Sequence, residues 1–173
     1  MTTPTLNAPV QHYEPFAGKY NEQMPRLLAA GYQPFSMAHV MRKRLEIYRM
    51  PVGDIRDALM AGWFGSYHDT ADGSAYNGDR IKIAIRAKPL ITITPESLLK
   101  DGALVITPDT YAQLDCQEFT RKDLEKAGIN IWLPIKKVRV HPVWQILAEE
   151  QTLLDDYSAM VFDILKTRAA MGV

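Results

Sequence analysis

The segment from residue 63 to residue 79, W-F-G-S-Y-H-D-T-A-D-G-S-A-Y-N-G-D, holds the side chains of this chain that are best suited to chemistry. Three aspartates and a histidine stand among two tyrosines, a tryptophan and three glycines. Loops that bind a ligand mix aromatic and ionisable groups on a rigid scaffold, whereas connecting loops are mostly small and polar. The segment is therefore the candidate ligand-binding site, with the candidate residues Trp63, Tyr67, His68, Asp69, Asp72, Tyr76 and Asp79.

Two kinds of catalysis are compatible with His68, Asp69, Asp72 and Asp79. Their oxygen and nitrogen atoms suit a hard or borderline metal ion, although their spacing does not match the EF-hand pattern. An imidazole oriented by a carboxylate is also typical of general acid–base catalysis in a small hydrolase-like enzyme. Because adjacent side chains of an extended segment point to opposite faces, Asp72 or Asp79 is a better partner for His68 than Asp69 is.

The same aspartates and glycines are typical of tight turns. Asp and Asn cap turns and tolerate left-handed backbone. Asn77-Gly78, directly before an apolar strand, predicts a hairpin in which Tyr76 ends the first strand. Three interpretations of the segment therefore remain open: structural turns, ligand or substrate contacts, and metal ligands. We predict no bound metal, and the sequence leaves any cofactor unknown.

Other residues with possible chemistry carry no recognisable motif. The lone Cys116 excludes an intramolecular disulfide and lacks the local signature of a thiol nucleophile. No glycine-rich phosphate loop is present. The basic residues of segment 42–49 and of segment 136–139 are typical of a solvated helix or strand face, so nucleic acid is an unlikely partner.

Composition and charge are those of an ordinary soluble protein. The 173 residues are 47% hydrophobic and 23% charged. Their 20 basic and 20 acidic residues cancel, which argues against a protein that mainly coats nucleic acid or an anionic membrane. Residues 1–10 lack the charged and apolar regions of a signal peptide, and no run approaches the ~18 apolar residues of a spanning helix. We therefore expect a cytoplasmic protein without a membrane segment.

The elements that hold the candidate segment are helices before it and a strand after it. A short helix is predicted over residues 24–30, and a second over residues 36–49 with Ser36 as its N-cap. A third begins near Asp54 and ends by residue 62 or 65. The alternation of isoleucines with basic residues then predicts a half-buried strand from Arg80 to Ala87.

In the second half of the chain, apolar runs and capping patterns predict short strands followed by helices. Leu90, Ile91 and Ile93 form a second short apolar run, and residues 129–133 and 136–140 are further predicted strands. Thr94-Pro95 and Thr107-Pro108 each have the pattern of a helix entry, with a capping Thr and a first-turn Pro. Capping boxes at residues 120–123 and 152–155 predict helices over 121–127 and 153–170, with another over 142–150.

This order of elements predicts an α+β fold. Helices lead, short strands cluster in the middle and helices close the chain, which favours a small, mostly antiparallel sheet packed against helices rather than a doubly wound fold. The strand at residues 80–87 is expected near the centre of the sheet. We predict a flexible N-terminal arm over residues 1–20 and a single domain over residues 21–173.

Several phrases of the sequence resemble those of an uncharacterised group of small, largely archaeal proteins of unknown function. They are D-T-x-x-G-x-A-Y at 69–76 with the K-I strand after it, H-P-x-W at 141–144 and A-M-G at 170–172. The resemblance covers roughly residues 35–173. It implies a cytoplasmic prokaryotic protein and transfers no activity, cofactor or functional residue.

The sequence favours a non-enzymatic binding or interaction protein over an enzyme, because it contains no catalytic signature. The alternative is the small hydrolase-like or metal-assisted enzyme that would use the histidine and aspartates of segment 63–79. Self-association is also expected, because the last helix carries an apolar stripe wide enough for both a core and a subunit contact, formed by Leu153, Leu154, Tyr157, Met160, Val161, Ile164 and Leu165.

Overall fold

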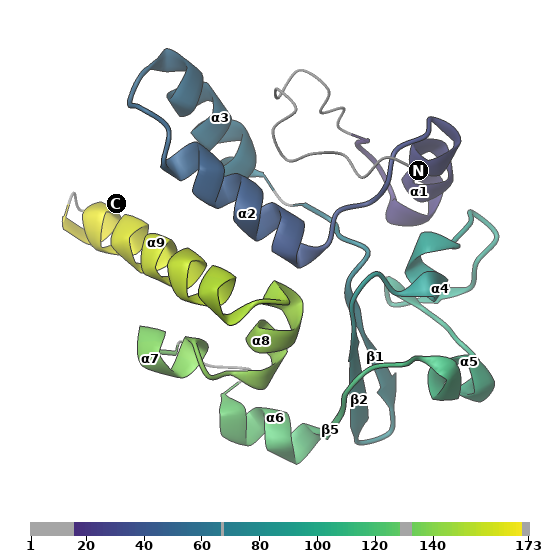
Figure 1. The fold of residues 1–173 in the computed structure, drawn as a ribbon. Coiled ribbons are helices and arrows are strands. Elements are labelled where there is room, and N and C mark those ends of the chain that lie inside the picture. The colour runs from purple at the N-terminus through teal and green to yellow at the C-terminus, as the bar shows by residue number, and fades with distance from the viewer. Residues whose placement is uncertain (1–15, 67, 129–132, 171–173) are drawn as a thin grey trace.

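The computed structural model describes residues 16–66, 68–128 and 133–170, which form nine helices and five strands (Figure 1). This mixture confirms the predicted α+β class. The helices are α1 (Tyr20–Ala29), α2 (Met37–Tyr48), α3 (Asp54–Gly65), α4 (Lys88–Ile91), α5 (Pro108–Gln113), α6 (Arg121–Ala127), α7 (Ile135–Val138), α8 (Pro142–Ala148) and α9 (Gln151–Ala170). The strands are β1 (Gly73–Asn77), β2 (Arg80–Ala84), β3 (Leu99–Lys100), β4 (Ala103–Leu104) and β5 (Glu118–Thr120).

Helix α2 lies at the centre of the larger group of helices, between α3 and α9 (Figure 1). Its apolar side packs with α8 and α9 in one core. Met41, Leu45 and Leu154 are almost fully buried in this core. Two ion pairs link these helices near their ends: Arg42 of α2 pairs with Glu150, directly before α9, at 2.8 Å, and Arg49, directly after α2, pairs with Asp156 of α9 at 2.7 Å. Exposed pairs of this kind add little stability, so the apolar contact is what holds the two helices together.

The three-stranded sheet has the order β1-β2-β5 and is antiparallel throughout. Strand β2 is therefore central, as predicted, although it ends at Ala84 rather than Ala87. Its isoleucines 81 and 83 are buried against Leu124 of α6 and the apolar side of α8. Of the two C-terminal helices, α8 covers one face of the sheet and α9 packs on α2.

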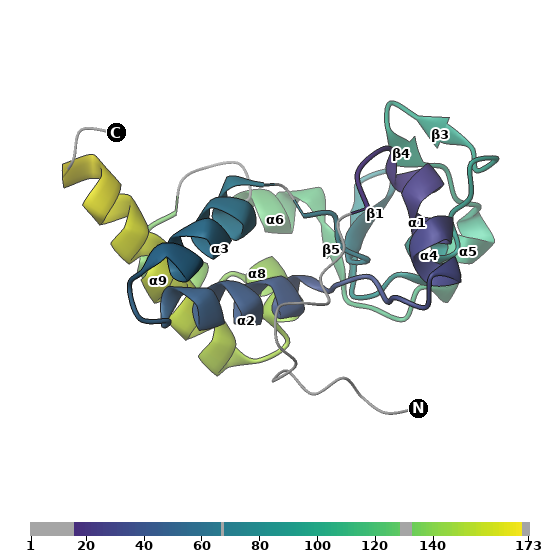
Figure 2. The ribbon, with the colours of Figure 1, turned by 90° about the horizontal axis from the view of Figure 1, so that it is seen from above.

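The remaining elements lie on the other side of the sheet from the larger helical group. Figure 2 shows α1, α4, α5 and the small hairpin β3-β4 gathered there. Among the described residues, no helix combines the length and the apolar composition needed to cross a membrane. The linker at residues 30–36 leads from α1 back to α2.

Local capping residues explain where several helices begin and end. The Ser36 side chain accepts a hydrogen bond from the His39 backbone N–H and caps α2, as predicted. Thr120 and Asp123 form the predicted capping box of α6, and Gly128 ends that helix with φ +93°. The predicted hairpin is also confirmed, but β1 continues through Asn77, so the two-residue loop is Gly78-Asp79, in which Gly78 has φ +62°.

Two predicted strands are helical in the structure. The apolar run at residues 90–93 overlaps α4, and residues 136–140 overlap α7. A proline lies at the beginning of each helix: Pro89 in the first turn of α4 and Pro134 at the N-cap of α7. Proline favours a helix start, and a short apolar alternation is also compatible with one helical turn. Most of the other predicted strand, residues 129–132, lies outside the described residues.

Three further boundaries differ from the prediction. Helix α9 begins at Gln151, so Thr152 lies inside its first turn and is not its cap. Thr107 does cap α5, whereas Thr94 begins a turn in which its N–H donates to Ser97. Tyr20, placed in the arm by the sequence, begins α1, while residues 1–15 of that arm lie outside the described residues. The single domain stays a prediction.

Candidate functional site

A half-open groove lies between α1 and α3 and is also lined by the linker residues 33–35 and by Ser66, His68 and Asp69. We call it the α1–α3 groove, and its volume is about 590 Å³. This size falls in the range of small-molecule sites. The described residues that line it are Phe16, Ala17, Gly18, Tyr20, Gln23, Met24, Leu27, Gln33, Pro34, Phe35, Ala58, Leu59, Gly62, Trp63, Ser66, His68 and Asp69.

The aromatic wall of the groove is built around Trp63, near the end of α3. Trp63 is only 5% exposed, and its ring stacks on the His68 ring with centroids 4.8 Å apart. The Phe35 ring is tilted against the Trp63 ring, with centroids 6.0 Å apart. The three rings come from two loops and a helix, so the wall exists only once α3 has packed beside the linker.

The imidazole of His68 is held by the backbone of α3. Its Nε2 donates to the Trp63 carbonyl oxygen at 3.2 Å, because a carbonyl can only accept. Burial lowers the pKa of His68, and the nearby Arg44 adds to the effect. The neutral ring therefore predominates at neutral pH, with Nδ1 as a hydrogen-bond acceptor.

Tyr20 lies near Asp69 and Asp72. Its hydroxyl donates to the Thr70 carbonyl oxygen at 3.2 Å. Burial raises the pKa of Tyr20 to about 12, and the negative charges of Asp69 and Asp72 act in the same direction. Among the described residues that line the groove, Asp69 carries the only formal charge at neutral pH, with His68 neutral.

The structure separates Asp72 from this groove. One carboxylate oxygen accepts from the Met37 backbone N–H at the start of α2, and the other accepts from the Arg86 N–H at 2.9 Å. Arg86 has a left-handed φ of +48°, which is uncommon for a side chain of its type. Asp72 thus ties the start of α2 to the bend that follows β2, which is a structural role.

Tyr76 and Asp79 lie further away, on the hairpin. Tyr76 is 60% exposed on β1, and its hydroxyl accepts from Ser74 at 3.1 Å. Asp79 is in the hairpin loop, where its carbonyl oxygen accepts from the Arg121 N–H at 2.7 Å. The structure therefore brings Trp63, His68 and Asp69 together and leaves the other described candidates apart, while Tyr67 lies outside the described residues.

The sequence did not identify the α1 side of the groove. Tyr20, Gln23, Met24 and Leu27 of α1 and the linker residue Phe35 all line it. The available signal was the helical spacing of the apolar residues 24 and 27 together with Tyr20, but Tyr20 fell in the segment assigned to the arm. Nothing in the local pattern indicates that α1 faces α3 across a groove.

A serine, a histidine and a carboxylate also meet at the start of α2, but their hydrogen bonds do not fit nucleophilic catalysis. Ser36 is fully buried and donates to the Glu149 carboxylate at 3.2 Å. Its oxygen contacts His39 Nδ1 at 2.8 Å, so His39 is the donor in that contact. A histidine that activates serine must instead accept the serine proton, and a buried hydroxyl cannot reach a substrate.

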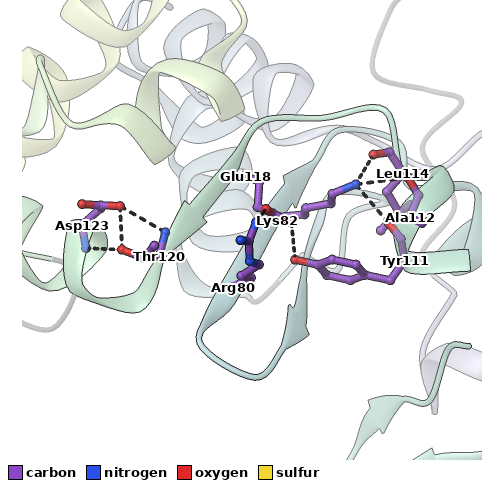
Figure 3. Close-up of polar contacts among 8 residues, drawn as sticks. All are labelled: Arg80, Lys82, Tyr111, Ala112, Leu114, Glu118, Thr120 and Asp123. Atoms are coloured by element: carbon purple, nitrogen blue, oxygen red, sulfur yellow. Dashed lines mark hydrogen bonds and ion pairs between the residues drawn. The ribbon is translucent and has the colours of Figure 1, made fainter. Parts of the chain in front are cut away.

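Lys82 forms the centre of a polar network on the other face of the sheet. Figure 3 shows its ammonium group donating to three carbonyl oxygens at the end of α5, those of Tyr111, Ala112 and Leu114, at 3.1, 3.3 and 2.8 Å. Tyr111 donates to Glu118 at 3.0 Å, and Glu118 pairs with Arg80. Burial, followed by the bond to Glu118, raises the pKa of Tyr111 to about 12. The Lys82 ammonium group and the Tyr111 hydroxyl are both bonded within the chain, so the network anchors α5 to the sheet.

Cys116 shows no sign of activation. Burial raises the pKa of its thiol, which lowers the fraction of the nucleophilic thiolate. No set of three or more His, Cys, Asp or Glu side chains in the described ranges is arranged to hold a metal ion.

Comparison of the chain with models of protein families, with curated proteins and with solved structures gives no match. The α1–α3 groove is therefore interpreted from its own geometry.

Proposed function

We propose that this chain is a non-enzymatic binding protein and that the α1–α3 groove holds a small, largely apolar molecule. The observation that carries the proposal is the wall formed by Trp63, His68 and Phe35 beside a groove of about 590 Å³. An apolar wall with a few directed polar groups is the usual composition of a small-molecule site. The methylene and methyl groups of Met24, Leu27 and Leu59 complete the apolar lining.

The contacts of the ionisable residues support binding rather than catalysis. Asp72 bonds to two backbone N–H groups, and Asp79 lies in the hairpin loop, so neither is placed to orient His68. General acid–base catalysis needs a carboxylate or a water positioned against the imidazole. The hydrolase-like and metal-assisted alternatives therefore lack a supporting arrangement among the described residues.

The groove can be tested with a pair of matched variants on α3. Ala58 lines the groove, whereas Ala61 is an exposed residue of the same helix outside the lining. A thermal-shift screen that includes apolar compounds, metals and nucleotides identifies a ligand, because a ligand that binds only the folded state raises its melting temperature. Ala58→Trp should remove that shift by filling the groove, and Ala61→Trp should keep it. Equal shifts in both variants would place the ligand elsewhere.

Nucleic acid is not proposed as a partner, because the basic side chains of α2 bond within the chain. Arg42 pairs with Glu150, directly before α9, Arg49 pairs with Asp156 of α9, and Lys43 contacts Glu46 at 2.9 Å. Arg44 donates to the Trp63 carbonyl oxygen at 2.8 Å and to Tyr157 at 2.9 Å. Retention of an oligonucleotide at low ionic strength, weakening with added salt, would contradict this proposal.

Self-association through α9 and the relation to small, largely archaeal proteins remain proposals. Much of the apolar stripe of α9 packs into the core, and Leu165, at 41% exposure, is left towards solvent. Val52 and Ile55, 81% and 73% exposed, offer further apolar surface at the start of α3. Light scattering should detect a dimer that Leu165→Glu dissociates, and a wild-type monomer at high concentration would contradict self-association.

A further inference from the structure

We propose that the ligand of the α1–α3 groove is an organic cation, an amine with an apolar body, whose ammonium group is held by Asp69, His68 and Tyr20. This inference rests on the proposed binding function and adds the charge of the ligand to it. It follows from three features of the groove: which polar atoms are acceptors, which formal charge is present and which rings stand beside it.

Three polar side-chain groups at this end of the groove, those of His68, Tyr20 and Asp69, offer acceptor atoms. His68 uses its Nε2 hydrogen in the bond to the Trp63 carbonyl oxygen, which leaves the lone pair of Nδ1. Tyr20 uses its hydroxyl hydrogen in the bond to the Thr70 carbonyl oxygen, which leaves the lone pairs of the phenol oxygen. The Asp69 carboxylate can only accept. A ligand group that satisfies all three must therefore carry several N–H or O–H donors, as an ammonium group does.

The formal charge at this end is negative. Within the described part of the chain, Asp69 makes no ion pair, and no lysine or arginine lines the groove. Arg44, whose charge acts on His68, does not line the groove, and its guanidinium donates to the Trp63 carbonyl oxygen and to Tyr157. An anionic ligand such as a nucleotide or a carboxylic acid would meet Asp69 without a compensating cation.

Aromatic rings provide the remaining contact that an ammonium group favours. Phe16 and Tyr20 both line the groove, and the face of an aromatic ring attracts a cation through its quadrupole. The apolar side chains of α1 and α3 extend from these rings along the groove. They accommodate an apolar body joined to the cationic group.

The test compares three probes of one shape by isothermal titration calorimetry: phenylbutylamine, phenylbutanol and phenylbutyrate. The amine should bind about tenfold more tightly than the alcohol, the acid should bind most weakly, and added salt should weaken the amine selectively. Asp69→Asn should lower the affinity for the amine to that for the alcohol. The affinity for the alcohol should stay the same. Asp79→Asn is the matched control, because it removes the same charge from the exposed hairpin loop.

The possible outcomes separate this inference from the proposed function. Equal binding of amine and alcohol, or an unchanged amine affinity in Asp69→Asn, would overturn the cation proposal and leave the binding groove in place. Tighter binding of the acid would also overturn it. No binding of any probe at millimolar concentration would overturn both proposals. A parallel loss in Asp69→Asn and Asp79→Asn would show a general charge effect and contradict a specific contact with Asp69.

Discussion

At the scale of single residues, His68 links the backbone of α3 to the α1–α3 groove. Its Nε2 hydrogen is fixed by the Trp63 carbonyl oxygen, while its ring lies on the Trp63 indole. Burial keeps its pKa below the usual 6.5, so the ring is a neutral acceptor at neutral pH. Protonation would place a positive charge where we propose that the ammonium group binds.

Binding of phenylbutylamine should therefore depend on the protonation of His68. We expect a constant affinity above about pH 6.5 and a decrease as the pH falls towards the lowered pKa of the folded protein. His68→Gln keeps an acceptor that does not titrate and should remove this decrease. Titration calorimetry between about pH 5 and pH 8 measures both proteins, and the same pH profile in the two would contradict the role of His68.

His141 makes a separate prediction about stability. It is 3% exposed, and neither ring nitrogen has a hydrogen-bond partner among the described residues. Burial lowers its pKa below 6.5, so the unfolded state binds more protons as the solution becomes acidic. Its contribution to stability is fully present above about pH 6.5 and is lost as the pH falls towards the folded-state pKa.

Urea unfolding at several pH values measures this contribution. His39 and His68 have pKa values shifted in the same direction by burial, so wild-type stability should decline on acidification through all three residues. His141→Leu removes one of them and should give a shallower decline. An unchanged slope of stability against pH would show that the imidazole of His141 is solvated or bonded in solution.

At the scale of elements, the Lys82 ammonium group makes three of the hydrogen bonds that attach the end of α5 to the sheet. Lys82→Met removes the three hydrogen bonds to carbonyl oxygens at the end of α5. We expect a loss of about 1–3 kcal/mol in the free energy of unfolding, typical for hydrogen bonds made by a charged group. Lys100→Met, at an exposed position of β3, is the control and should change stability by less than about 0.5 kcal/mol. Chemical denaturation compares the two variants.

Caps and strong periodicity made several elements predictable from the sequence. Ser36 and Thr120 mark helix starts because their side chains bond to nearby backbone groups, and the isoleucines of β2 alternate because one face is buried. Residues 136–140 were misread because four alternating residues fit a strand or one helical turn equally well. The hairpin β3-β4 was missed although Asp101-Gly102, with φ values of +52° and +80°, is a strong turn signal.

The candidate site was predictable only in part for a related reason. Trp63, His68 and Asp69 are close in the sequence, so a local pattern identified them together. Asp72 has a local pattern of the same kind, but its partners are the backbone N–H groups of residues 37 and 86, which are distant in the sequence. The α1 side of the groove likewise depends on how α1 packs, which no local pattern contains.

At the scale of the whole molecule, the core shared by α2, α8 and α9 should dominate stability. Leu154 is 1% exposed in this core, whereas Leu165 of the same helix is 41% exposed. Leu154→Ala should cost about 2–5 kcal/mol through lost burial and a residual cavity, and Leu165→Ala should cost less than about 0.5 kcal/mol. Equal effects in urea unfolding would contradict the packing of α9 on α2.

The measurement that tests the central claim most directly is a titration of the protein with phenylbutylamine followed by proton–nitrogen correlation NMR. We expect the largest shifts at the Trp63 indole N–H and at the backbone amides of the α1 and α3 residues that line the groove. The amides of Tyr76 and Asp79 on the hairpin should remain unchanged. Shifts centred on the hairpin, or on the cluster around Ser36, His39 and Glu149, with an unaffected Trp63 indole would contradict a ligand site in the α1–α3 groove.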